Sequence, residues 1–596
     1  MSIPAPADGW RWLEAGLRTG DVLTPGDDAR EHVAYFVRAD RDGPTTHRLL
    51  RFAAEGGARI RRVALELLDQ LCLPPSGWPL VADAAERAFG DVDPSVRSAA
   101  ARLLVNTAEP GRVMAAFNDS ADPIVRTALM EMMPWQRIRR HRAILERLRT
   151  DPVAAIRFLA NIALLGRDES PVRDAAIRAD LEASIDALEM RGSAGQRWAW
   201  ALAGADREKD LYHLAERLTD RAESESVRLE GVRMAAVAMG EWRAAPARVT
   251  PMLIRLLHDD GVRTAALHTL AASLTASRLA ADELAAMADD PRLGATAAIA
   301  LGCAGDHRAM PHLVRLLLAD SDQPRLTEAF RALARAGTDP EAPVIAARRI
   351  LASHPHHSEP ERAMRVLAAF GPRAAAAVPE LIVRLQQAVN DTPDWAMCVL
   401  GRIGPAATAA IPYLREYPTQ AARHALVEIT LDRASADRYL ANCPERLRHG
   451  GLAMDLLNGL AGNGGLTPRQ HRQLRSLFET SGSTQVGTAA ALWLHEGPAA
   501  AEELLEVLPE YLSDHRHAFT ALKVFTAMGP HAGPVLDRLD RFVAARRRAR
   551  FTTGDREVAM RADEALLAEM VRPGPPCRSR RSGAGRPGRE PRPAPR

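Results

Sequence analysis

One pattern of residues recurs along most of the chain, and it constrains the fold more than any other feature. Each copy begins with a β-branched residue, a leucine or a glutamine, often followed by arginine, and runs through small residues toward an apolar end. Neighbouring copies begin 29 to 40 residues apart, at Ile60, Val96, Val125, Ile156, Gln196, Val232, Val262, Leu293 and Leu326. A period in the low thirties is typical of helical hairpins that stack on one another. The sequence therefore predicts an all-α solenoid.

A second helix is expected between these copies, because a proline followed by an apolar stripe recurs there. The prolines predicted to open it are Pro251, Pro311, Pro379 and Pro412. Proline suits the first helical turn, where its missing N–H has no helical partner to lose. Acidic residues stand just before the next helix, at Asp93, Asp122, Asp259 and Asp290. Their side chains are well placed to cap helix N-termini, which indicates antiparallel hairpins.

A Gly-Pro pair separates the two helices at three places. The pairs are Gly371-Pro372, Gly404-Pro405 and Gly529-Pro530, each followed by a leucine ten residues beyond its glycine. Glycine favours the end of a helix and proline prevents its continuation. In the stretch LGRIGPAATAAIPYL (residues 400–414), Pro412 then begins the next helix. These residues predict where one helix ends and the next begins, and they indicate no catalytic or binding role.

Composition narrows the class of protein. Aromatic residues make up only 5% of the 596, which argues against a β-sandwich. The formal net charge of +3 is uneven: residues 571–596 carry eight arginines and one glutamate, so the rest is mildly acidic. Five cysteines lie far apart without a CxxC pair, and no signal peptide or long apolar run is evident. We expect a soluble, reduced cytoplasmic protein.

The repeat pattern also suggests an organisation along the chain. Residues 1–56 fit no repeat well and are expected to form an N-terminal helical cap. Residues 57–415 contain the regular repeats, and residues 416–571 contain divergent repeats followed by C-terminal capping helices. The last of these, an acidic helix over 555–570, is predicted to close the array. Residues 572–596 are rich in Arg, Pro and Gly, and a disordered basic tail is predicted there.

Taken together, the proline-led first helices, the Asp-capped VRxxAAxAL second helices and the GPxAxxAIPxL junctions resemble HEAT repeats. The similarity is greatest to the short bacterial kind that is grouped with phycobilin-lyase-like repeats. It covers roughly residues 57–545 and is strongest over 91–166 and 225–415. The resemblance implies a right-handed superhelix of the armadillo type. It also implies that the second helices line the concave face and the first helices the convex face.

The arginine that follows the first residue of many copies has two interpretations. The arginines concerned are Arg61, Arg97, Arg126, Arg157, Arg233 and Arg263. Either each pairs with an aspartate of its own or the neighbouring inter-helix turn, forming a structural ladder, or the row is presented to phosphates. The regular occurrence of nearby acids favours the structural ladder.

No catalytic, cofactor or metal site is predicted. The sequence lacks a phosphate loop, HExxH, GxSxG and paired CxxC motifs. Enzymes built on similar repeats, such as lyases or DNA glycosylases, remain alternatives, because Trp198 and Trp200 beside Arg197 could mimic a glycosylase surface. We interpret these tryptophans as packing residues. The histidines of SHPHHSEP, at 354, 356 and 357, are interpreted as a solvated loop, because no further ligands complete a tetrahedral site.

Two basic segments are candidate contacts for nucleic acid or an acidic partner. The first contains Arg137, Arg139, Arg140 and Arg142, and the second contains Arg546, Arg547, Arg548 and Arg550. Stacked hairpins bury a continuous core and leave a long shaped surface that suits extended partners. The leading hypothesis is therefore a non-catalytic scaffold that binds a protein along its concave groove. Nucleic-acid binding through the arginine segments is the alternative from a different class.

Overall fold

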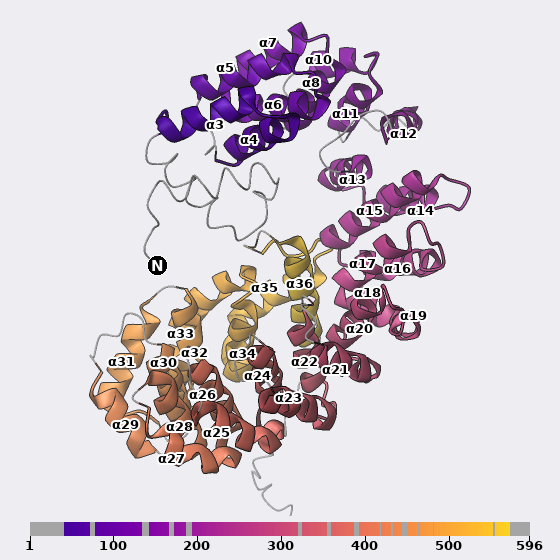
Figure 1. Cartoon of the computed structure of the whole chain (residues 1–596). Coiled ribbons are helices and arrows are strands. Elements are labelled where there is room, and N and C mark those ends of the chain that lie inside the picture. The colour runs from indigo at the N-terminus through magenta and orange to yellow at the C-terminus, as the bar shows by residue number, and fades with distance from the viewer. Residues whose placement is uncertain are drawn as a thin grey trace, which may run out of the picture. The chain divides into compact units, whose positions relative to one another are not determined.

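The computed structural model consists of helices joined by short turns (Figure 1). It describes residues 41–571 except 72–77, 134–141, 166–171, 186–192, 320–322, 324, 354–358, 387–391, 418, 431–432, 444–450, 463–464, 481, 552 and 554. Within these ranges every regular element is an α-helix or a 3-10 helix. The contacts divide the chain into two compact units, Met1–Leu270 (unit 1) and Ala271–Arg596 (unit 2).

In unit 1 the helices alternate between the first and second positions of a hairpin. They are α3 (Pro44–Glu55), α4 (Ala58–Leu71), α5 (Pro79–Arg87), η1 (Ala88–Gly90), α6 (Pro94–Thr107), α7 (Pro110–Asp119), α8 (Pro123–Met132), α10 (Arg142–Leu148), α11 (Ala154–Leu164), α12 (Val172–Ile185), α13 (Ala194–Gly204), α14 (Glu208–Leu218), α15 (Glu225–Glu241), α16 (Ala245–Leu256) and α17 (Arg263–Ala272). Each second helix contacts the next, in the order α4, α6, α8, α11, α13 and α15.

Unit 2 continues the alternation with many 3-10 turns. Its first half contains α18 (Leu274–Leu279), α19 (Ala281–Met287), α20 (Gly294–Cys303), η2 (His307–Ala309), α21 (Met310–Leu318), α22 (Leu326–Arg335), α23 (Glu341–Ser353), α24 (Glu359–Phe370), η3 (Gly371–Ala377), α25 (Val378–Gln386), α26 (Thr392–Ile403), η4 (Gly404–Ala410) and α27 (Ile411–Leu414). Its second half contains α28 (Gln420–Thr430), α29 (Arg433–Ala441), α30 (Gly451–Gly462), α31 (Pro468–Phe478), α32 (Ser483–Glu496), η5 (Gly497–Ala500), α33 (Ala501–Val507), η6 (Leu508–Ser513), α34 (Ala518–Met528), η7 (Gly529–Ala532), α35 (Gly533–Ala544) and α36 (Arg556–Val571).

The second helices of unit 2 contact one another in an unbroken series from α18 to α36, through every even-numbered helix between them. First helices also contact the next first helix, as α21, α23, α25 and α27 do. Leucines on the facing stripes, such as Leu333, Leu367 and Leu400, are fully buried. Each hairpin therefore covers the apolar face of its neighbour, which is the packing of an all-α solenoid.

Local sequence explains where several helices begin. Asp93 and Asp122 accept hydrogen bonds from the backbone N–H groups of Ser95 (2.8 Å) and Ile124 (2.7 Å), and a proline follows each aspartate. This is the expected Asp-Pro start. The prediction that Pro251 opens a helix is wrong, because α16 begins at Ala245 and contains Pro251 in its interior.

All three predicted Gly-Pro junctions have the same geometry. Gly371, Gly404 and Gly529 have φ values of +55°, +73° and +55°, a region that side-chain-bearing residues rarely adopt. A short 3-10 turn then leads into the next helix, and Pro412 lies in the first turn of α27. A fourth junction, at Gly497 (φ +60°), escaped the sequence pattern because the residue ten positions later is not leucine.

A row of arginine–aspartate pairs connects successive repeats of unit 1. The ion pairs join Arg61 to Asp91 (2.7 Å), Arg97 to Asp122 (2.5 Å), Arg126 to Asp151 (2.6 Å) and Arg157 to Asp180 (2.8 Å). Three of these arginines also donate to backbone carbonyls just before their own helix. Asp91, Asp122 and Asp151 also accept a backbone N–H two residues later, so these three pairs fix an inter-repeat turn from both sides, whereas Asp180 lies within α12. These four arginines therefore have structural partners.

The row of arginine–aspartate pairs, here called the ladder, shows that the repeat register predicted around Val232 is wrong. The arginine that occupies the ladder position there is Arg228, which pairs with Asp259 at 2.9 Å. Arg233 instead pairs with Glu230 of the same helix at 2.6 Å. The repeat begins one helical turn earlier than the sequence suggested, because VRL and VRM occur five residues apart in α15. Arg263 is the first residue of α17 and is half-buried.

Two stretches of unit 2 are long and apolar enough to pass a test for membrane spans, Pro360–Gln386 and Asp394–Leu414. Each consists of a second helix, a Gly-Pro junction and the start of the next first helix. Leu381 and Leu414, at the far ends of these stretches, are fully buried by neighbouring hairpins. The structure buries 39% of the most apolar window of the first stretch and 50% of that of the second.

Replacing Asp91 by Asn should lower the free energy of unfolding of unit 1 by about 1–3 kcal/mol, because Arg61 loses a charged partner in a partly buried site. The hydrogen bond from Arg61 holds the pKa of Asp91 below its usual range, against the effect of burial. The stabilising contribution is thus complete above about pH 4 and is lost as the pH falls through the lowered pKa.

Urea unfolding at pH 7 and at decreasing pH would measure this effect. The wild type and the Asp91→Asn variant should converge as the medium becomes acidic. Asp119→Ala, at an exposed position of α7, is the matched control and should change stability by less than about 0.5 kcal/mol. Equal stability of the Asp91→Asn variant and the wild type at pH 7 would contradict the ladder's role.

Candidate functional site

A groove of about 960 Å³ runs along the second helices of unit 2, and it is the candidate site. Five consecutive second helices supply its walls, namely α22, α24, α26, α28 and α30, with Arg433 of α29 beside them. Grooves and clefts of this size are the usual places at which proteins hold a ligand or a segment of a partner. The contacts between these helices fix which side chains point into it.

Equivalent positions of successive repeats point into the groove. Arg331, Arg365 and Cys398 each lie six residues before the glycine that ends their repeat, at Gly337, Gly371 and Gly404. Gly459 has the same spacing to Gly465. Glu428 lines the groove in the repeat between Cys398 and Gly459. Equivalent positions of α22, α24, α26 and α30 therefore face the groove, and Glu428 faces it from α28.

The end of the groove formed by α22, α24 and α26 is cationic and aromatic. Arg331 and Arg402 are exposed there. The Arg365 guanidinium lies 5.2 Å from the ring centre of Trp395, whose side chain is 39% exposed. A guanidinium stacked on an indole forms a favourable cation–π contact. This end therefore combines positive charge with an accessible apolar surface.

The end formed by α28 and α30 is acidic. The His424 ring lies between two carboxylates, with its Nε2 atom 3.6 Å from Glu428 and 3.8 Å from Asp455. Burial raises the pKa of both carboxyls, and the Asp455 charge raises the pKa of Glu428 further, while His424 and Arg402 oppose these shifts. Gly401 faces the Glu428 carboxylate so closely that a side chain at Gly401 would displace it.

Cys398 is exposed in the groove, although a cysteine in an apolar helical run is usually a small core residue. Burial by the surrounding helices still raises the pKa of its thiol, and Asp394 contributes to this shift. Cys303, in contrast, is buried in α20, and burial raises the pKa of its thiol to about 12. The two thiols therefore differ in their exposure to solvent.

The other candidate residues are possible metal ligands and the tryptophan pair of α13. Among the described residues, no three His, Cys, Asp or Glu side chains are arranged to hold a metal ion. The histidines at 354, 356 and 357 lie outside these ranges. Trp198 is fully buried and Arg197 is ion-paired with Glu131, whereas Trp200 is 42% exposed. Trp198 is thus a packing residue as expected, and Trp200 is only partly so.

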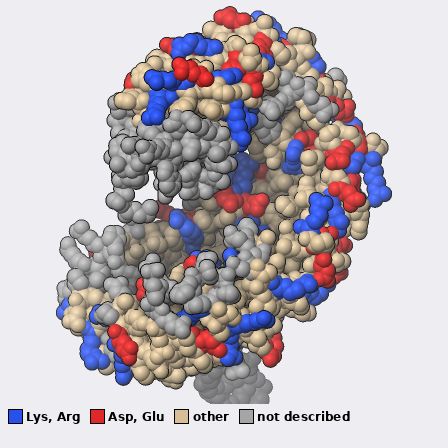
Figure 2. Space-filling view, in the orientation of Figure 1, with Lys and Arg blue, Asp and Glu red and all other residues tan. Residues whose placement is uncertain are grey.

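The first basic segment falls mostly outside the described residues. Arg137, Arg139 and Arg140 belong to 134–141, which the structure does not describe. Arg142 is exposed at the start of α10 and pairs with Glu146 of the same helix at 3.7 Å. On the face drawn in Figure 2, positive and negative side chains are interspersed among the described residues.

The second basic segment is divided between the surface and the interior. Arg546 and Arg550 are exposed and Arg547 is half-buried. Arg548 is only 7% exposed, so the expectation of a surface contact is wrong at this position. Its guanidinium donates to Glu564 (2.8 Å) and forms an ion pair with Asp563 (3.3 Å), both in α36. The acidic partner of Arg548 is therefore part of the same chain.

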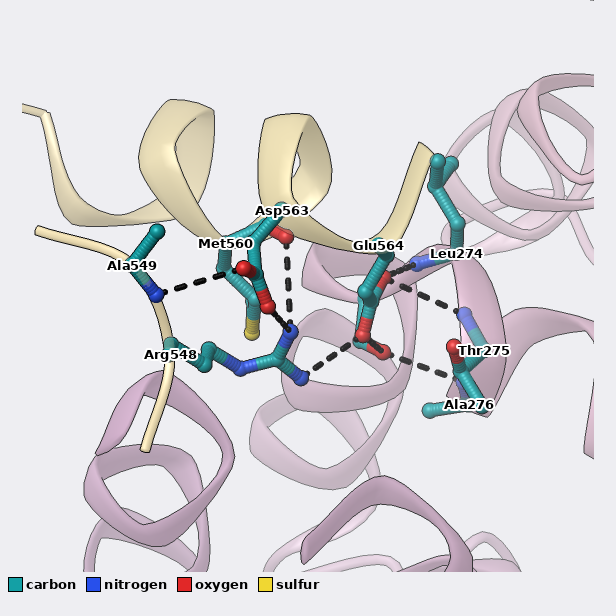
Figure 3. A network of polar contacts seen from close by, with 9 residues as sticks. Leu274, Thr275, Ala276, Arg548, Ala549, Met560, Asp563 and Glu564 are labelled. Atoms are coloured by element: carbon teal, nitrogen blue, oxygen red, sulfur yellow. Dashed lines mark hydrogen bonds and ion pairs between the residues drawn. The ribbon is translucent and has the colours of Figure 1, made fainter. Parts of the chain in front are cut away.

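Glu564 connects the two ends of unit 2 (Figure 3). Its carboxylate accepts hydrogen bonds from the Ser273 hydroxyl (2.6 Å) and from the backbone N–H groups of Leu274 (2.6 Å) and Thr275 (3.2 Å). These donors lie at the N-terminus of α18, where the helix dipole favours negative charge. Helix α36 contacts both α18 and α34, so the series of second helices closes into a cycle.

We call the contact between Glu564, Arg548 and the N-terminus of α18 the clasp. A second ion pair, between Arg561 of α36 and Glu328 of α22 at 3.6 Å, supports it. The acidic helix was expected to close the array, but its attachment to α18 was not foreseen. The adjacent acids Asp563 and Glu564 were the available signal in the sequence.

Comparison with known proteins finds matches among solved structures. No family model matches the sequence, and no curated protein matches it. Among solved structures, yeast importin-β (Kap95p) is similar with a TM-score of 0.42 and 12% identity, over 94% of this chain and 93% of that one. Kap121p bound to Ste12p is similar with a TM-score of 0.36 and 10% identity, over 91% and 71%. Likeness at this level assigns no function to this chain.

Replacing Glu564 by Ala should open the clasp. Arg548 would lose its nearest carboxylate and the N–H groups of α18 their acceptor, a change that typically costs about 3–5 kcal/mol for a buried ion pair. Hydrogen exchange in peptides covering residues 273–280 and 556–571 should accelerate together. Glu506→Ala, at an exposed position of α33, is the control. Unchanged exchange in the Glu564→Ala variant would show that the clasp does not hold α36.

The two described helical cysteines should differ in reactivity. At pH 8 without denaturant, iodoacetamide should modify Cys398 at least about tenfold faster than Cys303, because the nucleophile is the thiolate and Cys303 is both buried and far from ionised. Mass spectrometry of the tryptic peptides would give both rates. In denaturant the rates should become similar. Equal rates in the native protein would contradict the assignment of Cys398 to the groove.

Proposed function

We propose that the chain is a HEAT-like scaffold that binds an extended segment of a protein partner along the groove of unit 2 and performs no catalysis itself. The observation that carries this proposal is the row of side chains that five stacked second helices direct into one groove. A surface repeated at helix spacing matches an extended chain better than a compact small molecule. The short repeat type suggested by the sequence remains part of this proposal.

The composition of the groove supports a protein partner. Apolar side chains, including Trp395, Val427 and Leu456, alternate with charged ones such as Arg365 and Asp455. Exposed tryptophan and arginine are the residues that most often anchor protein interfaces. A mixed wall of this kind can bury apolar contacts while polar groups fix the register of the partner.

The nucleic-acid alternative is less well supported by the described residues. Phosphate binding requires arginines that are accessible and not neutralised. Arg548 is buried against Asp563 and Glu564, and Arg142 has an acid beside it. The row of arginines in unit 1 is likewise paired with aspartates.

A cytoplasmic location, proposed from the sequence, agrees with the free thiols of Cys303, Cys398 and Cys443.

The test uses Cys398 as a natural attachment point inside the groove. The full chain, with Cys443 and the cysteines at 72 and 577 replaced by serine, is labelled at Cys398 with a photo-crosslinker and exposed to an extract of the source cells. We expect a discrete crosslinked partner, identified by mass spectrometry. Introducing Trp395→Asp should abolish this product, because the change removes an aromatic anchor and adds a negative charge beside Arg365.

A matched control places the crosslinker on the first-helix side of the same repeats. Arg349→Cys in α23 is exposed and lies outside the groove lining. In a variant that also carries Cys398→Ser, the same partner should not crosslink from position 349. The proposal fails if crosslinking is equally efficient from position 349, or if Trp395→Asp leaves the product at Cys398 unchanged while circular dichroism shows that the variant is folded.

A further inference from the structure

We propose that the groove selects a bipolar segment, which carries an acidic cluster facing α22 and α24 and a basic cluster facing α28 and α30. This inference rests on the proposed function, because it names the chemistry of the partner that the groove would bind. It commits to one kind of occupant, an extended protein segment with charges of both signs in separate clusters.

The arginines that line the groove come from α22, α24 and α26, whereas the carboxylates come from α28 and α30, with Arg433 of α29 beside them. Arg331 and Arg365 occupy the row in α22 and α24, Cys398 is neutral in α26, and Glu428 follows in α28. Asp455 of α30 adds a second carboxylate at the same end as Glu428. A segment of a single sign would therefore be attracted at one end of the groove and repelled at the other.

Arg402 and Arg433 also line the groove, but among the described residues neither forms an ion pair with Glu428 or Asp455. His424 lies 3.6 Å from Glu428 and 3.8 Å from Asp455, distances longer than those of a good hydrogen bond. The Oε2 atom of Glu428 is buried and has no hydrogen-bond partner in the described part of the chain. An ammonium or guanidinium group from a partner would supply the missing donor and relieve the repulsion between the two carboxylates.

The cationic end offers the complementary site. Arg331 and Arg402 are exposed, and Arg365 is held over the Trp395 ring, 5.2 Å from its centre. Glu361 pairs with Arg365 at 2.6 Å, but this contact is exposed and within one helix, so a partner's carboxylate can replace it at little cost. Carboxylates of the partner would meet three guanidinium groups beside an accessible indole.

The spacing of the helices sets the length of the segment. Packed helices lie about 8–10 Å apart, so the three steps from α22 to α28 span roughly 25–30 Å. An extended chain rises about 3.3 Å per residue, so about eight residues separate the two charged clusters of the partner. The groove would thus read two charge clusters at a defined distance.

Three synthetic peptides of 16 residues test the proposal. One carries four glutamates and four lysines separated by eight Gly/Ser residues, and the other two carry only glutamate or only lysine at the same eight positions. Fluorescence anisotropy of dye-labelled peptides gives affinity, and protection of Cys398 from alkylation reports occupancy of the groove. The bipolar peptide should bind on the order of tenfold more tightly than either single-sign peptide and should protect Cys398.

Charge changes in the groove should redirect this preference. The Arg331→Glu/Arg365→Glu variant should prefer the lysine peptide, and the Glu428→Gln/Asp455→Asn variant should prefer the glutamate peptide. Arg349→Glu on α23, an exposed change of the same kind outside the groove lining, should leave the preference unchanged. Circular dichroism and thermal unfolding establish that each variant remains folded.

The outcomes separate this inference from the proposed function. If the single-sign peptides bind as tightly as the bipolar one, or if the preference does not follow the charge changes, the bipolar inference is overturned. If no peptide protects Cys398 of the unlabelled chain but the partner identified by crosslinking does, the groove is a docking site of different chemistry and the inference again fails. If neither peptides nor partner protect Cys398, both the inference and the proposed function are wrong.

Discussion

The burial of one hairpin's apolar face by the next hairpin is the interaction on which this structure depends. No single hairpin has enough core to be stable alone, so the second helices pack in series from α4 to α15 in unit 1 and from α18 to α36 in unit 2. Polar contacts then fix how successive repeats meet. In unit 1 the arginine–aspartate ladder does this, and one of its aspartates, Asp122, also caps a helix. In unit 2 the positive-φ glycines of the Gly-Pro junctions set the turn instead.

Much of this arrangement follows from short-range signals. Asp122 before Pro123 and Gly404 before Pro405 mark helix ends because capping and backbone strain depend on neighbours in the chain. The helical class, the hairpin plan and the pairing of three ladder arginines with turn aspartates could therefore be predicted, whereas Asp180, the partner of Arg157, lies within α12. The register around Val232 could not, because two valine–arginine pairs lie five residues apart and only packing decides between Arg228 and Arg233. Pro251 was misplaced for a similar reason, since tertiary packing overrides the local preference for a helix start.

The sequence predicted which helices form the candidate groove but not which side chains line it. The resemblance to HEAT repeats implied that second helices line the binding surface, and these helices do form the groove of unit 2. Which of their side chains point inward depends on the rotation of each helix, which is set by packing on both sides. This rotation exposes Cys398 but buries Cys303, although both lie in similar Ala- and Leu-rich helices. It also buries Arg548, which the sequence could not distinguish from its exposed neighbours. The hydrogen bond between Ser273 and Glu564 joins residues 291 positions apart, and no short-range sequence pattern indicates such a contact.

The clasp has a consequence for how unit 2 reaches its native state. An open solenoid can fold from any repeat outward and fray from either end, since each repeat depends only on its neighbours. Joining Glu564 to α18 makes the two terminal repeats neighbours of each other, so neither end is free to fray. In an unfolded chain, closing a loop of this length would cost about 5 kcal/mol of conformational entropy. Once the intervening hairpins have stacked, their curvature has already brought the ends together. Docking of α36 is therefore expected to be a late folding step, after which the whole cycle unfolds as one cooperative body.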